Sequence, residues 1–230
     1  MIRSLYSASS GMVAQSLKQD IIANNIANAQ TPGFKRSRVV SESFSDVMNR
    51  ENVSFPEMDR PAYPDSPLNP TLVQAKDNID FSQGSIQMTG KPEDLAISGK
   101  GYFSIDTGKG VRYTRAGDFR LDKDRYLCTQ AGEKVLGEKG PIKVPDAQWQ
   151  IDEDGSVVSA GQTIDKIKIT GGDAKTTRIL QGSIEGSNVS IVREMVGMIT
   201  NMRAYEANQK VIVASDETLG KAVSEVGKVA

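Results

Sequence analysis

The sequence of 230 residues contains no histidine and only one cysteine, Cys128. Without an imidazole base, the serine and cysteine triads of hydrolases are excluded, and so are histidine-ligated zinc and iron sites. A single cysteine excludes an intramolecular disulfide, and its apolar neighbours predict a small packed thiol. Carboxylate or lysine catalysis remains conceivable. No nucleophile, base and orienting group come together in the sequence, however, so we expect neither an enzyme nor a cofactor.

Three further absences restrict location and partners. No run of about eighteen apolar residues predicts a membrane span. The first residues contain no apolar stretch followed by a small-residue cleavage site, so we expect no cleaved secretory signal, and on these grounds alone the chain would be cytosolic. The formal net charge is −1, and the basic cluster Lys35–Arg38 is interpreted as a solvated or inter-subunit loop. Nucleic-acid binding is therefore not expected.

The C-terminal stretch from Asn188 to Val229 predicts a long helix with heptad spacing. Ser187 and Asn188 offer a helix N-cap, and no proline interrupts the stretch. Two rows of residues, each with a spacing of seven, contain eight apolar members out of ten. Such a seam is typical of a helix that packs against other helices. The rows are Met195, Met202, Gln209, Asp216 and Val223, and Met198, Tyr205, Ile212, Leu219 and Val226.

Residues 2–29 predict a second helix of the same kind. Its two rows are Leu5, Met12, Gln19 and Ile26, and Ala8, Gln15, Ile22 and Ala29. If the apolar rows of both terminal helices pack together, they form a coiled-coil stem, and the middle of the chain is an insertion. The alternative is an ordinary globular protein with a helix at each terminus.

The first helix is expected to end in a turn at Pro32 and Gly33. The asparagines Asn24, Asn25 and Asn28 near this end indicate capping or contacts with a neighbouring chain, with fraying as the alternative.

The middle of the chain divides into a connector and a β-rich domain. Five prolines between Pro56 and Pro70 exclude a helix and predict an extended connector with little structure of its own. From 83 to 182, short runs between turn residues predict an antiparallel sandwich or barrel, with a hairpin turn at Asp154 and Gly155. The expected strands are 95–98, 102–106, 111–114, 126–129, 142–144, 149–152, 156–159 and 166–170. The acidic turns 122–124 and 152–155 lack the spacing of a calcium loop, so we expect no metal.

Three groups of residues, in the right order, resemble the flagellar rod and hook axial proteins. The first group is Ala8-Ser9-Ser10-Gly11-Met12, Asn24-Asn25-Ile26-Ala27-Asn28 and Thr31-Pro32-Gly33-Phe34-Lys35. The second is Leu95-Ala96-Ile97-Ser98-Gly99-Lys100-Gly101-Tyr102-Phe103 and Tyr113-Thr114-Arg115-Ala116-Gly117-Asp118-Phe119. The third is Gly186-Ser187-Asn188-Val189, Glu194-Met195-Val196, and Arg203-Ala204-Tyr205-Glu206-Ala207-Asn208.

This resemblance implies a structural subunit of the bacterial flagellar basal-body rod, which polymerises helically with copies of itself and other rod proteins and transmits torque. It also implies export through the flagellar type III apparatus without a cleaved signal, and hence a periplasmic location. The blocks 140–145 and 180–188 are most similar to the proximal-rod protein that carries a β-module. Arg125 stands where the family usually has a turn glycine. The alternative function is a non-flagellar secreted adhesin or envelope-linker protein.

The expected fold class is therefore α+β, with terminal helices that pair as a coiled-coil stem and an inserted antiparallel β-rich domain. The expected domains are an N-terminal helix at 1–36, a connector at 37–82, the β-rich domain at 83–182 and a C-terminal helix at 183–230. The subunit-packing residues that we expect are Leu5, Met12, Ile22, Asn24, Asn25, Ile26, Asn28, Met195, Met198, Met202, Tyr205, Ile212 and Leu219.

Overall fold

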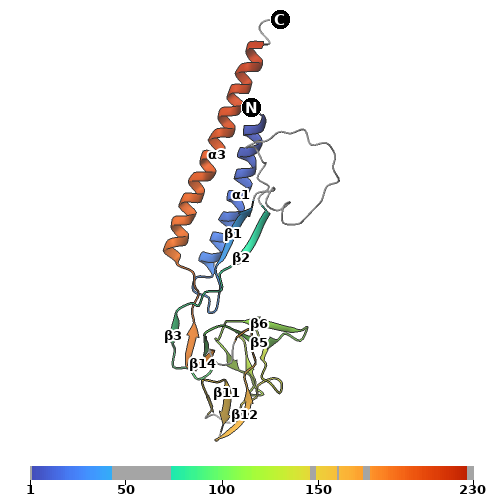
Figure 1. Cartoon of the computed structure of the whole chain (residues 1–230), viewed down its shortest axis with the longest axis vertical. Helices are drawn as coiled ribbons and strands as arrows, with labels where there is room; N and C mark the ends of the chain where they lie inside the picture. The colour runs from blue at the N-terminus through green and yellow to red at the C-terminus, as the bar shows by residue number, and fades with distance from the viewer. Residues whose placement is uncertain (1, 43–73, 146–148, 160, 173–176, 227–230) are drawn as a thin grey trace, which may run out of the picture. The chain divides into compact units, whose positions relative to one another are not determined.

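The computed structural model describes residues 2–42, 74–145, 149–159, 161–172 and 177–226. The chain forms two compact units, each described here by itself. The helical unit comprises Met1–Ile26, Ser37–Asp80 and Ser190–Ala230, and the β unit comprises Ala27–Arg36 and Phe81–Val189. The two helices of the described residues come from the two ends of the chain and the strands from between them, so the α+β class is confirmed (Figure 1).

Helix α1 spans Ile2–Ala27 and helix α3 spans Ile191–Val226. Helix α3 begins three residues later than the expected start at Asn188. The side chain of Asn188 is engaged elsewhere, because its Oδ1 accepts a hydrogen bond from the Arg36 N–H at 2.7 Å. The predicted N-cap at Ser187 and Asn188 was therefore wrong. Residue Ser190 precedes the helix, and Glu194 lies in its first turn, where a carboxylate interacts favourably with the helix dipole.

Strands β1 (Ser37–Glu42) and β2 (Gln74–Ile79) pair antiparallel in the helical unit, with Ser37 opposite Ile79. Arg38 adds an ion pair with Asp80 at 3.3 Å. These strands are the two ends of the stretch that we expected to be a connector, so these ends are more regular than that prediction. Residues 43–73, which include the five prolines, lie outside the described residues.

Asn25 links the last turn of α1 to strand β1. Its side chain is 1% exposed, its Nδ2 donates to the Ser37 carbonyl at 2.8 Å, and its Oδ1 accepts from the Ser37 N–H at 3.0 Å. The amide thus satisfies both backbone groups of Ser37, as a neighbouring strand would. The contact of this asparagine lies inside the chain, and helix fraying does not explain it.

The β unit contains several small antiparallel sheets of different sizes. The largest sheet has six strands: five in the order β13-β5-β9-β8-β7, and β6, which also pairs with β5. A second sheet has three strands in the order β10-β11-β12. Two strand pairs, β14 with β4 and β15 with β3, complete the set. The strands are β3 (Ile86–Met88), β4 (Leu95–Ser98), β5 (Tyr102–Asp106), β6 (Val111–Thr114), β7 (Arg120–Leu121), β8 (Leu127–Cys128), β9 (Lys134–Val135), β10 (Trp149–Ile151), β11 (Ser156–Ser159), β12 (Gln162–Lys166), β13 (Ile169–Thr170), β14 (Arg178–Gln181) and β15 (Ser183–Glu185).

One apolar core holds these sheets together. Phe103 packs edge-to-face on Phe119 with ring centroids 5.2 Å apart, and both side chains are at most 3% exposed. The core is formed by Leu95, Ile97, Phe103, Ile105, Phe119, Leu127, Val135, Ile142, Val144, Trp149, Ile151, Val157, Ile167 and Ile179. Cys128 is buried, as a packed thiol requires, and burial raises its pKa.

The strand predictions are confirmed for β4, β5, β6 and β11, whose bounds match, and for the hairpin turn between β10 and β11. The run 142–144 is not a strand: Lys143 makes only an isolated bridge to Tyr126. The β unit also includes 27–36 and 183–189, which we had assigned to the helical ends. Arg125 has a φ of 63°, the left-handed conformation that glycine adopts more easily.

Asp118 leads to a prediction about pH. Burial is the largest cause that raises the pKa of Asp118 above its ordinary 3.8, the charge of Asp94 adds to it, and a backbone hydrogen bond opposes it. A raised pKa means that the folded state binds the proton more tightly than the unfolded state. The contribution of Asp118 to stability is therefore full below pH 3.8 and is lost as the pH rises through the raised pKa.

Asp118→Asn is accordingly expected to remove this loss, measured by urea unfolding at a series of pH values. Asp154→Asn is the control of opposite sign. Hydrogen bonds from Ser156 lower the pKa of the exposed Asp154, so its contribution is present above pH 3.8 and is lost as the pH falls. Parallel pH profiles for the wild type and Asp118→Asn would contradict the prediction.

Candidate functional site

Polar side chains of α3 take part in the contact between α1 and α3. Asn201 donates through Nδ2 to the Gln15 carbonyl at 2.7 Å and to the Gln19 side-chain oxygen at 2.9 Å. Further along, Asn25 lies 3.4 Å from the Glu194 carboxylate. At the other end of the contact, a Cβ on Gly11 would lie 3.0 Å from the Asn208 amide nitrogen. The row of α3 that faces α1 is therefore Glu194, Asn201 and Asn208.

This row differs from the apolar seam that we expected to meet α1. Met195 and Met202 each follow a member of the polar row by one residue, and one residue turns the side chain by about 100° around an α-helix. Both methionines are 52% exposed. The apolar rows of α1 do lie on the contact side, since Ala8 and Ile22 are each 6% exposed. The error arose because heptad counting considered apolar residues only, whereas the amides of α3 pair with the glutamines of α1.

An apolar stripe runs along the exposed side of α3, and its last member, Met202, lies at the edge of the contact with α1. Its members recur every three or four residues over three turns, which places them on one side of the helix. They are Val192 (73% exposed), Met195 (52%), Val196 (57%), Ile199 (53%) and Met202 (52%). We call these five residues the α3 stripe. A contiguous apolar surface of this kind on a helix marks a protein–protein contact.

Helix α1 exposes a smaller apolar patch of its own. Val13 is 59% exposed and Leu17 is 38% exposed, and their spacing of four residues puts them on one side. This side lies away from Gly11, Gln15 and Ile22, which contact α3. We call Val13 and Leu17 the α1 patch. The paired helices therefore present apolar groups on two opposite outer sides.

The expected subunit-packing residues separate into three groups by exposure. Those exposed are Leu5, Asn24, Met195, Met202 and Tyr205; those half-buried are Met12, Ile26, Asn28, Met198, Ile212 and Leu219; those buried within the chain are Ile22 and Asn25. Sequence reasoning missed Val192, Val196 and Ile199. A search with a period of 3.6 instead of 3.5 would have found them next to Met195 and Met202.

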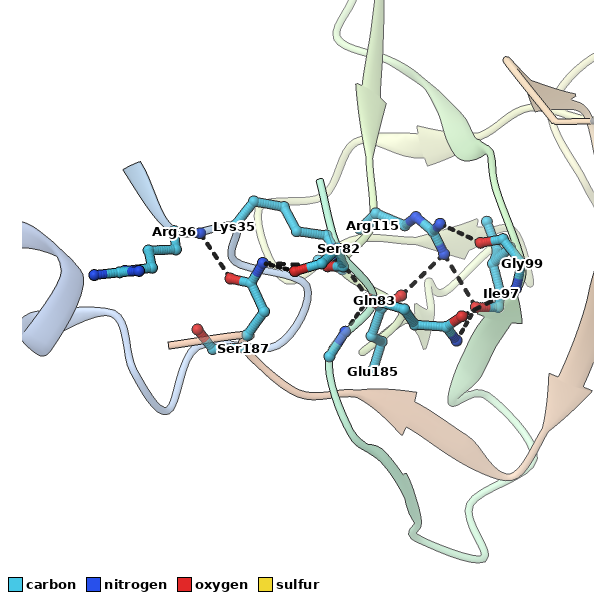
Figure 2. Close-up of polar contacts among 12 residues, drawn as sticks. Lys35, Arg36, Ser82, Gln83, Ile97, Gly99, Arg115, Glu185 and Ser187 are labelled. Carbon is cyan, nitrogen blue, oxygen red and sulfur yellow. Dashed lines mark hydrogen bonds and ion pairs between the residues drawn. The ribbon is translucent and has the colours of Figure 1, made fainter. Parts of the chain in front are cut away.

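A buried ion cluster in the β unit joins segments that are far apart in the sequence (Figure 2). The Glu185 side chain is fully buried, with one oxygen 2.6 Å from the Lys35 Nζ and the other 3.0 Å from Arg115 Nη1. The Gly84 N–H donates to the same carboxylate at 3.0 Å. Arg115 also donates to the carbonyls of Ile97 and Gly99. We call Lys35, Arg115 and Glu185 the anchor cluster.

The anchor cluster fixes the segment that follows α1 within the β unit. The Gly33 N–H donates to the Glu185 carbonyl at 2.7 Å, and Lys35 donates to the Ser82 carbonyl at 2.8 Å. Asn188 donates to the same Ser82 carbonyl at 3.2 Å. The basic residue Lys35, which we had interpreted as part of a solvated or inter-subunit loop, is thus half of a buried ion pair. These contacts hold the segment after α1 in place.

Over the described part of the chain no group of three or more cysteine and acidic side chains could hold a metal ion. Neither described helix combines the length and apolar character of a membrane span.

Comparison with known proteins shows which family the chain belongs to. It matches the flagellar basal body rod protein family over residues 5–35, the flagellar hook protein FlgE/F/G D1 domain over 96–159, and the flagellar basal body rod FlgEFG protein C-terminal family over 180–225. It is 37% identical to the flagellar basal-body rod protein FlgG of Bacillus subtilis, covering 97% of this chain and 99% of that protein. The chain belongs to the flagellar basal-body rod protein family.

Other rod proteins of the family are similar to this chain over nearly its whole length. FlgG of Borreliella burgdorferi is 34% identical over 96% of this chain and 97% of its own length, and FlgG of Buchnera aphidicola from Schizaphis graminum is 31% identical over 96% and 98%. The predicted structural rod subunit of the basal body is therefore confirmed, and the adhesin or envelope-linker alternative is not favoured. These relatives are structural rod proteins, in keeping with the expectation that the chain is not an enzyme. The proximal subtype stays a prediction.

The anchor cluster takes one residue from each matched region of this rod protein. Lys35 lies at the end of the first region, Arg115 in the second and Glu185 in the third. Three separate blocks of sequence are thereby tied to one buried carboxylate.

Proposed function

We propose that this rod protein polymerises with copies of itself, and joins other rod proteins, in a helical tube that transmits torque. Its terminal helices act as the coiled-coil stem of each subunit. The observation that carries this proposal is the pair of apolar faces, the α3 stripe and the α1 patch, on opposite outer sides of the paired helices. Each face lacks a partner among the described residues of the chain itself.

The position of the two faces favours an open assembly over a closed dimer. When the α3 stripe of one copy packs on the α1 patch of the next, the assembly still presents one unused stripe at one end and one unused patch at the other. Such a contact is heterologous, and it continues as a helix unless its rotation closes a ring. A two-fold dimer would need one face that complements itself.

The energetics favour assembly with several neighbours at once. Full burial of a Val, Ile or Met side chain is worth about 1.5–3 kcal/mol, and the α3 stripe retains half or more of its exposure, so the stripe supplies roughly 5 kcal/mol. Association costs about 4–15 kcal/mol in lost freedom of motion. One contact alone is therefore weak, and subunits are expected to add only at a growing end.

A charge placed in the α3 stripe tests this function. Ile199→Glu in the full chain is expected to abolish swimming and to leave rods incomplete in purified basal bodies, because packing would bury an unpaired carboxylate. Far-UV circular dichroism of the isolated protein should remain that of the wild type. Thr200→Glu is the matched control, since it adds the same charge at the adjacent exposed position outside the stripe. Normal rods with Ile199→Glu would contradict the proposal, and motile cells lacking the protein would favour the envelope-linker alternative.

We also propose export through the flagellar type III apparatus, from subunits whose terminal helices open easily before assembly. Polar contacts and exposed apolar faces give α1 and α3 little tertiary stabilisation, and isolated helices are marginal without it.

Hydrogen exchange on verified monomers tests the open state. Amides of α1 and α3 are expected to exchange with opening free energies near 0 kcal/mol, whereas amides of β5 in the core should approach the global value. Fully protected terminal helices in a monomer would contradict this part of the proposal. Loss of the protein from the export fraction in cells without the export apparatus tests the route itself.

A further inference from the structure

A groove of about 440 Å³ lies between α1 and α3 in the helical unit. Its walls include Gln19 and Asp20 from α1, and Asn201, Met202, Tyr205 and Glu206 from α3. Met202 also belongs to the α3 stripe, so the groove opens beside the surface that the proposed function assigns to a neighbour. The residues that line it include two carboxylates and no lysine or arginine.

At the base of the groove, a buried acceptor lacks a donor. Asn201 is 3% exposed, and its Nδ2 donates to the oxygens of Gln15 and Gln19. These two acceptors fix the orientation of the amide, so the other terminal atom is the oxygen. Among the residues that the structure describes, nothing donates a hydrogen bond to this Oδ1. Because a buried polar atom without a partner is destabilising, the groove is suited to a ligand that brings a donor.

The chemistry of the groove selects the kind of donor. Asp20 and Glu206 at the exposed rim favour a cation, while Met202 and the Tyr205 ring offer apolar surface to the stem of a long side chain. An arginine fits all three requirements. Its planar fork of five N–H groups can donate to an amide oxygen and pair with a carboxylate at the same time.

The chain carries an arginine that suits this role. Arg203 follows Val192, Val196 and Ile199 at helical spacing, so it extends the outer face of α3. It is exposed, and over the described residues it forms neither an ion pair nor a hydrogen bond. It comes two residues after Asn201, which turns it by about 200° around the helix. Arg203 therefore points away from the groove of its own chain.

We propose that the groove at Asn201 receives Arg203 from a second copy of this chain. The guanidinium donates to the free Asn201 Oδ1 and pairs with Asp20 at the rim. Each copy carries one groove and one arginine on different sides of α3, so the contact is head-to-tail, as the open assembly requires. This inference rests on the proposed polymerisation and names the contact that sets its register.

A charge exchange tests the contact in cells that assemble the full-length protein. Arg203→Asp and Asp20→Arg are each expected to reduce the number of complete rods in purified basal bodies by more than about tenfold, because each leaves like charges facing each other. The double variant, with both changes in one chain, should restore assembly, since every contact then regains a pair of opposite charges. Arg203→Lys should be intermediate, because an ammonium lacks the fork.

The controls separate this inference from the function on which it rests. Arg193→Asp removes another exposed arginine outside the stripe and is expected to assemble normally. Circular dichroism should show that the exposed substitutions leave the helices as in the wild type. If Arg203→Asp assembles like the wild type, or if the double variant is no better than the single ones, the Arg203 contact is overturned. If Ile199→Glu also assembles normally, the proposed function fails as well.

Discussion

Replacing Glu185 with glutamine is expected to lower the free energy of unfolding of the rod protein by about 3–5 kcal/mol. The neutral amide leaves Lys35 and Arg115 as two buried cations without a counter-charge, with their side chains only 8% and 5% exposed. Because the penalty comes from burying like charges together, it exceeds the loss of the hydrogen bonds alone. Urea unfolding followed by the fluorescence of Trp149 in the core measures it.

Two variants make this prediction specific. Glu153→Gln is the matched control, because Glu153 forms an ion pair with Arg178 at 3.0 Å in which both side chains are about two-thirds exposed. That change should cost about 0–1 kcal/mol. Adding Lys35→Met to Glu185→Gln removes one of the stranded cations and should recover part of the loss. Equal effects of Glu185→Gln and Glu153→Gln would show that the anchor cluster does not hold the segment.

The second large effect is expected at Gly33. Its φ is 68°, and a Cβ there would lie 2.2 Å from the backbone nitrogen of Ala116 and 2.4 Å from the carbonyl carbon of Arg115. These are backbone atoms of the β unit, so they have little freedom to move. Gly33→Ala is therefore expected to expel the turn from its place, break the Gly33 N–H bond to Glu185 and cost about 3 kcal/mol or more.

Gly90→Ala separates the clash from the conformational cost. Gly90 has almost the same φ, 72°, but a Cβ there would meet nothing within 4 Å. It should cost only about 1–2 kcal/mol, the ordinary penalty of the left-handed conformation for alanine. The difference between the two variants in thermal unfolding measures the close approach of the turn. If both variants lose the same stability, the turn is not packed on Ala116.

Local patterns explain why several elements were predictable. The short runs that become β4, β5 and β11 lie between turn residues such as glycine and aspartate. A short run bounded in this way indicates a strand without knowledge of its partner. Arg125 was expected to alter its turn, but its positive φ is the conformation that a turn glycine adopts. Run 142–144 is not a strand because its backbone hydrogen bonds are divided between separate neighbours. The Ile142 N–H donates to the Val135 carbonyl, and the Val144 N–H donates to the Arg125 carbonyl.

The contacts of the helices were less accessible to sequence reasoning. Heptad spacing correctly predicted two helices, but it did not reveal which side of α3 meets α1. On that side Asn201 donates to oxygens of Gln15 and Gln19. Asn25 of α1 donates to the Glu194 carboxylate, whereas Met195 and Met202 are half-exposed. Counting apolar residues cannot detect a polar match between two helices.

By itself, the sequence determined the class of the protein, its two terminal helices, several of its short strands and its membership of the rod family, because these depend on local periodicity and on ordered motifs. Only the tertiary structure decided that Glu185 collects Lys35 and Arg115, 150 and 70 residues away, and that α3 turns an apolar stripe outward. The physical reason is that a buried charge and a helix face acquire their partners from segments remote in the chain, and the energy of those pairings exists only once the segments meet.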